Sequence, residues 1–195
     1  MSNQIETLVE VQLTNRNRAT AFWRGVLVVP IGIFLSSFYQ FGHFATWSTP
    51  LIVMPAFLAL VFREVYPSYV LTINHALMEL STRAAAYALL LTDDYPSIER
   101  NPNIALIFPD IDGGKKLNRW LPLVKWLLAI PLYLVGLIYT VLSFIVTIYA
   151  WIATSITGNY PEAAANIVLG TIDYWNRVYG YAIVLVTDEY PSFSL

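Results

Sequence analysis

The stretch Trp126–Pro161, WLLAIPLYLVGLIYTVLSFIVTIYAWIATSITGNYP, runs for 36 residues without Asp, Glu, Lys or Arg. A second uncharged stretch, Gly25–Phe62, covers 38 residues. A spanning helix needs about 20 apolar residues, so each stretch is long enough to cross a bilayer. In the whole chain 57% of residues are hydrophobic and 12% are charged. These features predict an all-α integral membrane protein; the alternative is a buried helical hairpin in a soluble protein.

Composition excludes several classes of function. The net charge of -2 offers no electrostatic surface for nucleic acid, so no nucleic-acid partner is expected. The absence of Cys excludes disulfides, thiol catalysis and Cys-based metal sites. We find no sequence signature of a catalytic, cofactor-binding or metal site.

The two uncharged stretches predict a polytopic, multi-pass fold made of helical hairpins. A single helix over 25–62 would reach about 57 Å, well beyond the roughly 30 Å hydrocarbon core. We therefore expect hairpins over 23–63, with a turn at 42–50, and over 120–157, with a turn near 139–143. This arrangement leaves all 11 Lys and Arg on one side, with both termini cytoplasmic. One span per stretch is the alternative.

The chain is predicted to contain two tandem repeats, 5–97 and 104–193, because similar residues recur 94 to 101 positions apart. The clearest match is TDDYPS at 92–97 with TDEYPS at 187–192. Each repeat would hold one hairpin followed by an amphipathic helix, over 67–91 and 161–186, suited to the membrane interface or to a groove between helices.

A short β segment is possible at the start of each repeat. Val9, Val11 and Leu13 alternate with polar residues, the period of a half-exposed strand. Its partner would lie within Asn103–Asp112, on the cytoplasmic face. An irregular arm is the competing interpretation.

Charged pairs on the two amphipathic helices are the first candidate site residues. Glu79 and Arg83 are four residues apart, as are Asp173 and Arg177, so each pair can form an ion pair on one helix face. The pair either stabilises its helix at the headgroups or presents the Arg to a lipid phosphate or to the acidic motif of the other repeat.

The acidic motifs at the end of each repeat are the second group. They either cap helix ends and meet an Arg from the other repeat, or bind a divalent ion or move a proton. The candidate lipid or partner contacts are Glu79, Arg83, Asp93, Asp94, Tyr95, Asp173, Arg177, Asp188, Glu189 and Tyr190.

Two segments, LVKWLLAIP at 123–131 and TDEYPSFSL at 187–195, resemble a family of small bacterial integral-membrane proteins known as a domain of unknown function. Its members repeat a basic anchor, an Ala-Ile-Pro helix, Tyr-Pro, an amphipathic helix and a Thr-Asp-Glu-Tyr-Pro-Pro-Phe ending. The resemblance covers 104–195 well and 5–97 more loosely.

This chain departs from that pattern at two places. The family's usual His after Ile-Pro is Leu132 here and Ile31 in the first repeat, and its second Pro is replaced by Ser97 and Ser192. The resemblance implies a membrane fold in the bacterial cytoplasmic (inner) membrane and implies no activity.

We therefore expect a non-catalytic accessory or scaffold subunit that associates with membrane lipids, with itself as a homo-oligomer, or with a larger membrane complex. The alternative is a small channel or uncoupled transporter, with Ser36, Gln40 and Thr140 facing a shared pathway. An enzyme acting on lipid is the third hypothesis.

Overall fold

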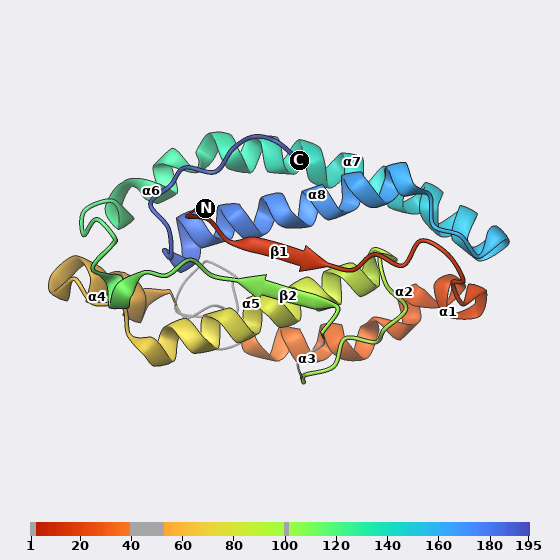
Figure 1. Cartoon of the computed structure of the whole chain (residues 1–195), viewed down its shortest axis with the longest axis horizontal. Coiled ribbons are helices and arrows are strands. Elements are labelled where there is room, and N and C mark those ends of the chain that lie inside the picture. The colour runs from red at the N-terminus through yellow and green to blue at the C-terminus, as the bar shows by residue number, and fades with distance from the viewer. Residues whose placement is uncertain (1–2, 40–52, 100–101) are drawn as a thin grey trace.

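The computed structural model describes residues 3–39, 53–99 and 102–195, and most of them are helical (Figure 1). The elements in chain order are β1 (Glu6–Val9), α1 (Arg18–Phe22), α2 (Arg24–Leu27), α3 (Val29–Tyr39), α4 (Met54–Arg63), α5 (Ser68–Ala88), β2 (Ile104–Ile107), η2 (Asp112–Gly114), α6 (Pro122–Leu128), α7 (Ile130–Thr157), α8 (Glu162–Tyr179) and the π-helical turn η3 (Gly180–Val184).

The predicted short β segment is confirmed. β1 pairs antiparallel with β2, with Glu6 opposite Ile107 and Val9 opposite Ile104. β1 ends at Val9, so Val11 and Leu13, on which the prediction rested, lie just after the strand. Within β1 the half-buried side chains are Thr7 and Val9, whereas Leu8 is exposed. The two strands lie side by side near the middle of the long axis, in front of α5 and α8 (Figure 1).

α5 and α8 form the inside of the molecule. α7 packs along α8, and α3 packs against α5, so the outer helices follow opposite long edges (Figure 1). The two largest core clusters combine both halves of the chain; one joins Val70 to Val186, and another joins Leu91 to Val168. The predicted amphipathic helices therefore occupy grooves between other elements, the second of the two settings expected for them.

The hairpin predicted over 120–157 is wrong, because α7 is one continuous helix from Ile130 to Thr157. Nothing between Leu132 and Thr157 interrupts the helical hydrogen bonds, and the helix ends where Gly158 takes φ 76°. The hairpin was inferred from the placement of positive charge, which does not itself bend a backbone. α7 is about 42 Å long at 1.5 Å per residue.

The first uncharged stretch forms α2, α3 and α4, close to the predicted helices 23–41 and 50–63. α3 packs on α5, whereas α4 packs on α5 and α6. The predicted turn at 42–50 lies outside the described residues. Within the described part of the chain, α7 is the one helix that is both long and apolar enough to cross a membrane.

Candidate functional site

Asp93, in the first acidic motif, is the centre of a buried ionic cluster. Its Oδ1 accepts hydrogen bonds from Arg16 Nη2 at 2.8 Å and Arg24 Nη2 at 2.5 Å, and its Oδ2 accepts one from the Asn17 N–H at 2.9 Å. The Arg16 and Arg24 side chains are 0% and 2% exposed. One carboxylate is therefore the shared counterion of two buried guanidinium groups.

Asp188, in the second acidic motif, has a closely similar environment. Its Oδ1 lies 2.6 Å from Lys125 Nζ, and its Oδ2 accepts a hydrogen bond from the Asn118 N–H at 2.5 Å. Lys125 Nζ also donates to the Thr187 carbonyl at 2.6 Å. Lys125 is completely buried, so its charge depends on these two oxygens.

Aromatic rings cover both buried cations. The Arg24 guanidinium lies 3.9 Å from the centroid of the Tyr87 ring, and Lys125 Nζ lies 5.1 Å from that of Tyr181. Each ring in turn makes an edge contact with the Tyr of its acidic motif, Tyr95 or Tyr190. A cation over a ring face is stabilised by the negative potential of that face.

Electrostatics at the two clusters follow from burial and charge. Burial by itself would raise the pKa of Asp93, but hydrogen bonds from Arg16, Asn17 and Arg24 and the charge of Arg16 together hold it below its ordinary 3.8. Burial lowers the pKa of Lys125 below 10.5, with Asp188 acting in the opposite direction. The side chains of Asp93 and Asp188 are 17% and 23% exposed, so water reaches both clusters only in part.

The acidic motifs meet basic residues of their own half of the chain. Asp93 contacts Arg16 and Arg24, and Asp188 contacts Lys125, so the predicted pairing with an Arg of the other repeat is wrong. Each acidic motif follows the inner helix of its half, α5 or α8. The chain there lies beside the segment that leads into the outer helix of the same half, and the basic partners are in that segment.

Both predicted helix-face ion pairs are present. Arg83 pairs with Glu79, and Arg177 Nε lies 3.0 Å from Asp173 Oδ2. Arg83 also donates to the carbonyls of Ser97 and Glu99, at 3.0 Å and 2.6 Å.

Arg177 makes the equivalent contacts to the C-terminal tail. It donates to Ser192 Oγ and to the Ser194 carbonyl, both at 2.7 Å. Each Arg thus binds the segment after the acidic residues of its own half. One hypothesis had expected each Arg to bind the acidic motif of the other half, and these contacts do not show that.

The second acidic residue of each motif is less enclosed. Asp94 accepts a hydrogen bond from Asn103 Nδ2 at 3.0 Å, and Glu189 accepts one from the Asn3 N–H at 2.9 Å. Among the residues that the structure describes, no three His, Cys, Asp or Glu are grouped to hold a metal ion.

Sequence reasoning missed Arg16 as a site residue, and it also missed four cluster members whose positions recur in the sequence: Arg24, Tyr87, Lys125 and Tyr181. They were visible in the sequence only as members of the recurring series, since Arg24 recurs as Lys125 after 101 positions and Tyr87 as Tyr181 after 94. The recurrence of a basic residue and of a tyrosine at matching positions of the two halves was the signal that could have identified these residues.

Two buried tyrosines tie the halves of the chain together. Tyr66 donates to the Val184 carbonyl at 2.8 Å, and Tyr160 donates to the Leu89 carbonyl at 3.1 Å. Burial raises the pKa of each to about 12, with the Asn74 hydrogen bond opposing this at Tyr66 and the Arg16 charge opposing it at Tyr160.

We predict that these two hydroxyls make the fold sensitive to alkali. Because the folded pKa lies above the unfolded value of about 10, their stabilisation is complete below pH 10 and is lost as the pH rises towards 12. Tyr66→Phe should lower the free energy of unfolding at pH 8 by roughly 0.5–1.5 kcal/mol. Tyr66→Phe and Tyr160→Phe together should flatten the fall between pH 10 and 12.

Denaturant unfolding in detergent micelles at several pH values measures this effect. Tyr69→Phe is the matched control, because the Tyr69 side chain is exposed. An unchanged alkaline slope in the double variant would contradict the prediction.

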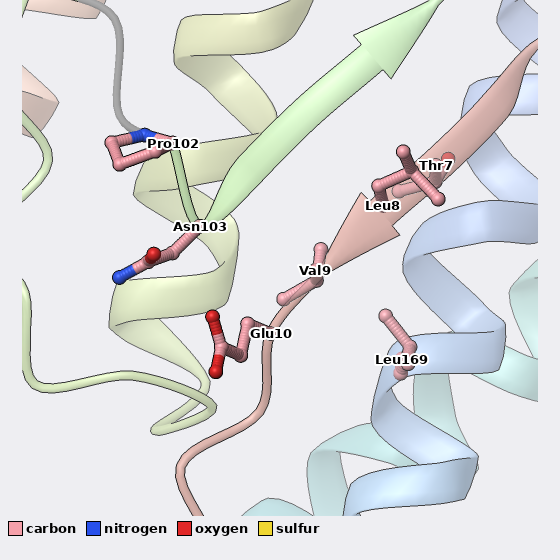
Figure 2. Close-up of a pocket in the computed structure, with 7 residues that line it drawn as sticks. All are labelled: Thr7, Leu8, Val9, Glu10, Pro102, Asn103 and Leu169. Carbon is pink, nitrogen blue, oxygen red and sulfur yellow. The ribbon is translucent and has the colours of Figure 1, made fainter.

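A shallow pocket of about 410 Å³ lies at one end of the two-stranded sheet. It is lined by Thr7, Leu8, Val9, Glu10, Pro102, Asn103 and Leu169 (Figure 2). The lining combines the Thr7 hydroxyl, one carboxylate and one amide with apolar groups, and Thr7 Oγ1 accepts a hydrogen bond from Asn176 Nδ2 at 3.1 Å.

The polar residues expected to line a pathway have local partners. Ser36 Oγ donates to the Ile33 carbonyl of its own helix at 2.7 Å. Thr140 Oγ1 donates to the Gly136 carbonyl at 2.8 Å and accepts from Trp175 Nε1 at 2.9 Å. Gln40 lies outside the described residues.

Comparison with known proteins gives a partial match. Residues 120–194 match the family model for a domain of unknown function, DUF4389. This segment contains α6, α7, α8, Lys125 and Asp188, and the match is consistent with the predicted resemblance to a domain of unknown function. No curated protein and no solved structure matches the chain.

Proposed function

We propose that this chain is a non-catalytic accessory or scaffold subunit of the cytoplasmic membrane, associating with lipid and with itself or a larger complex. The observation that carries the proposal is the outer face of α7. Its exposed side chains include Leu134, Leu137, Ile138, Val141, Phe144, Ile145, Ile148, Ile152 and Ile156. A continuous apolar face of this length marks a lipid or protein contact rather than a water-exposed surface.

The inner face of α7 supports the same proposal. The buried residues of α7 are Leu132, Gly136, Ser143, Ala150 and Thr154, so apart from Leu132 they are small or carry a hydroxyl. Membrane helices commonly pack through small residues in this way, because small side chains let backbones approach closely.

Tandem duplication is part of the proposal and is supported by matched contacts. The hydrogen bond from Asn17 to Asp93 corresponds to that from Asn118 to Asp188. Leu90 and Leu185 end their helices with φ 66° and 65°, in corresponding positions.

The inner helices meet at a corresponding pair. Thr82 hydrogen-bonds to Asn176, which lies 94 positions later in the sequence. A contact between equivalent residues is expected where a pseudo-two-fold axis passes between two copies of one unit.

The proposed lipid contact predicts the effect of a charge on α7. Ile145→Arg places a cation on a residue that is 59% exposed, so it disturbs little internal packing. A cation at the centre of a spanning helix costs about 2.5–3.5 kcal/mol, and about half of that cost at a lipid-facing position already lowers the membrane-integrated fraction about tenfold, which is the change we expect. Carbonate washing of membranes followed by immunoblotting measures that fraction.

Leu8→Arg is the matched control. Leu8 is 52% exposed and lies on β1, away from α7, so the same change of charge should leave membrane integration unchanged. If Ile145→Arg remains in the washed membrane like the control, the α7 face does not contact lipid and the proposal fails.

A further inference from the structure

α6 exposes its apolar side chains and buries its charged one, the opposite of a helix on a water-exposed surface. Its one charged residue, Lys125, is completely buried. The residues around it point outward instead: Leu123, Val124, Trp126 and Leu127 are each more than 40% exposed. In water this arrangement would expose the apolar side chains and bury the cation, the opposite of what solvation favours.

α2 repeats this inversion in the other half of the chain. Arg24 is 2% exposed, whereas Trp23 and Val26 are 58% and 62% exposed. Trp beside apolar side chains is typical of the boundary between headgroups and hydrocarbon. The surroundings that suit both helices are therefore lipid, and both present an interfacial Trp.

The two inverted helices lie towards opposite ends of the long axis, and the sheet lies between them (Figure 1). Glu6 and Glu10, on and just after β1, are exposed near the middle of that axis. If the long axis were normal to the bilayer, these carboxylates would lie at its midplane, where ionised groups are strongly disfavoured.

We infer that the protein lies with its long axis in the membrane plane, with α2 and α6 inserted into the same leaflet and the sheet facing water. The occupant of the α2 and α6 surfaces is then bilayer lipid, and α7 follows the leaflet instead of crossing it. This inference rests on the proposed membrane association. In this orientation Lys and Arg remain on one side of the membrane, although α7 is a single helix and not a hairpin.

Single-Cys labelling tests this orientation, because the chain contains no Cys. Lys115→Cys and Glu162→Cys place one thiol beyond each end of α7, at exposed positions. Glu6→Cys reports on the sheet, and Leu134→Cys reports on the lipid-facing side of α7. Each variant is treated with a membrane-impermeant maleimide in intact spheroplasts and in inside-out vesicles.

We expect the thiols at 115, 162 and 6 to react from the same side, and the thiol at 134 to react only after detergent is added. Asn159→Cys, also exposed, repeats the reading at the second end if Glu162→Cys accumulates poorly. Labelling of 115 and 162 from opposite sides would overturn the orientation while leaving membrane association intact. Recovery of the chain outside the membrane fraction would overturn the proposed function as well.

Discussion

Replacing Asp93 with Asn is expected to lower the free energy of unfolding by about 3–5 kcal/mol. The substitution keeps the shape of the side chain but removes its charge. Arg16 and Arg24, whose side chains are 0% and 2% exposed, then lose their shared counterion. The new amide also replaces one acceptor oxygen with a donor, so either both guanidinium groups or the Asn17 N–H lose their hydrogen bonds to this side chain. Denaturant unfolding in detergent micelles measures the loss.

Asp110→Asn is the control for this prediction. Asp110 also pairs with a cation, Lys116, at 2.5 Å, but its side chain is 79% exposed. Water and salt screen such a pair, so its loss should leave stability unchanged within error. Equal losses in the two variants would show that burial of the Asp93 cluster does not set its contribution.

Replacing Gly136 with Ala should destabilise the chain by about 1–3 kcal/mol, because it overfills the contact between α7 and α8. A Cβ at this position would lie 2.7 Å from Trp175 Cζ2 and 3.0 Å from Tyr174 Cε1. Neither ring can move freely: Trp175 donates to Thr140, and Tyr174 donates to the Leu132 carbonyl at 2.8 Å. Thermal unfolding in micelles gives the size of the effect.

Gly32→Ala is the matched control on α3. A Cβ there meets no other group within 4 Å, and removing a glycine from a helix stabilises it by roughly 0.5–1 kcal/mol. The two substitutions should therefore change stability in opposite directions. A stabilising Gly136→Ala would contradict the tight packing of α7 on α8 on which the prediction rests.

Local features of the sequence predicted most helix positions well. α5 and α8 start directly after Pro67 and Pro161, because Pro is tolerated before a helix or in its first turn but not in its interior. Alternation at Val9, Val11 and Leu13 identified side chains that pack on the core, although only Val9 lies in β1. These are properties of neighbouring residues, so they are visible without knowledge of the fold.

The partners of charged residues were less accessible. Glu79 with Arg83 and Asp173 with Arg177 were predicted because four-residue spacing is set by helix geometry. The contacts of Asp93 with Arg16 and Arg24 span 77 and 69 residues, and no local rule gives such pairs. For this reason the predicted pairing of Asp93 and Asp188 with basic residues of the opposite half was wrong.

By itself, the sequence determined that the chain is mostly helical, where its inner helices begin, and that it holds a stretch long and apolar enough to cross a membrane, because these depend on composition, spacing and Pro. Only the tertiary structure decided that α7 runs unbroken, that Arg24 and Lys125 point inward, and which carboxylate each cation meets. The physical reason is that side-chain burial and long-range ion pairing depend on how helices pack, and packing brings together residues that sequence spacing leaves far apart.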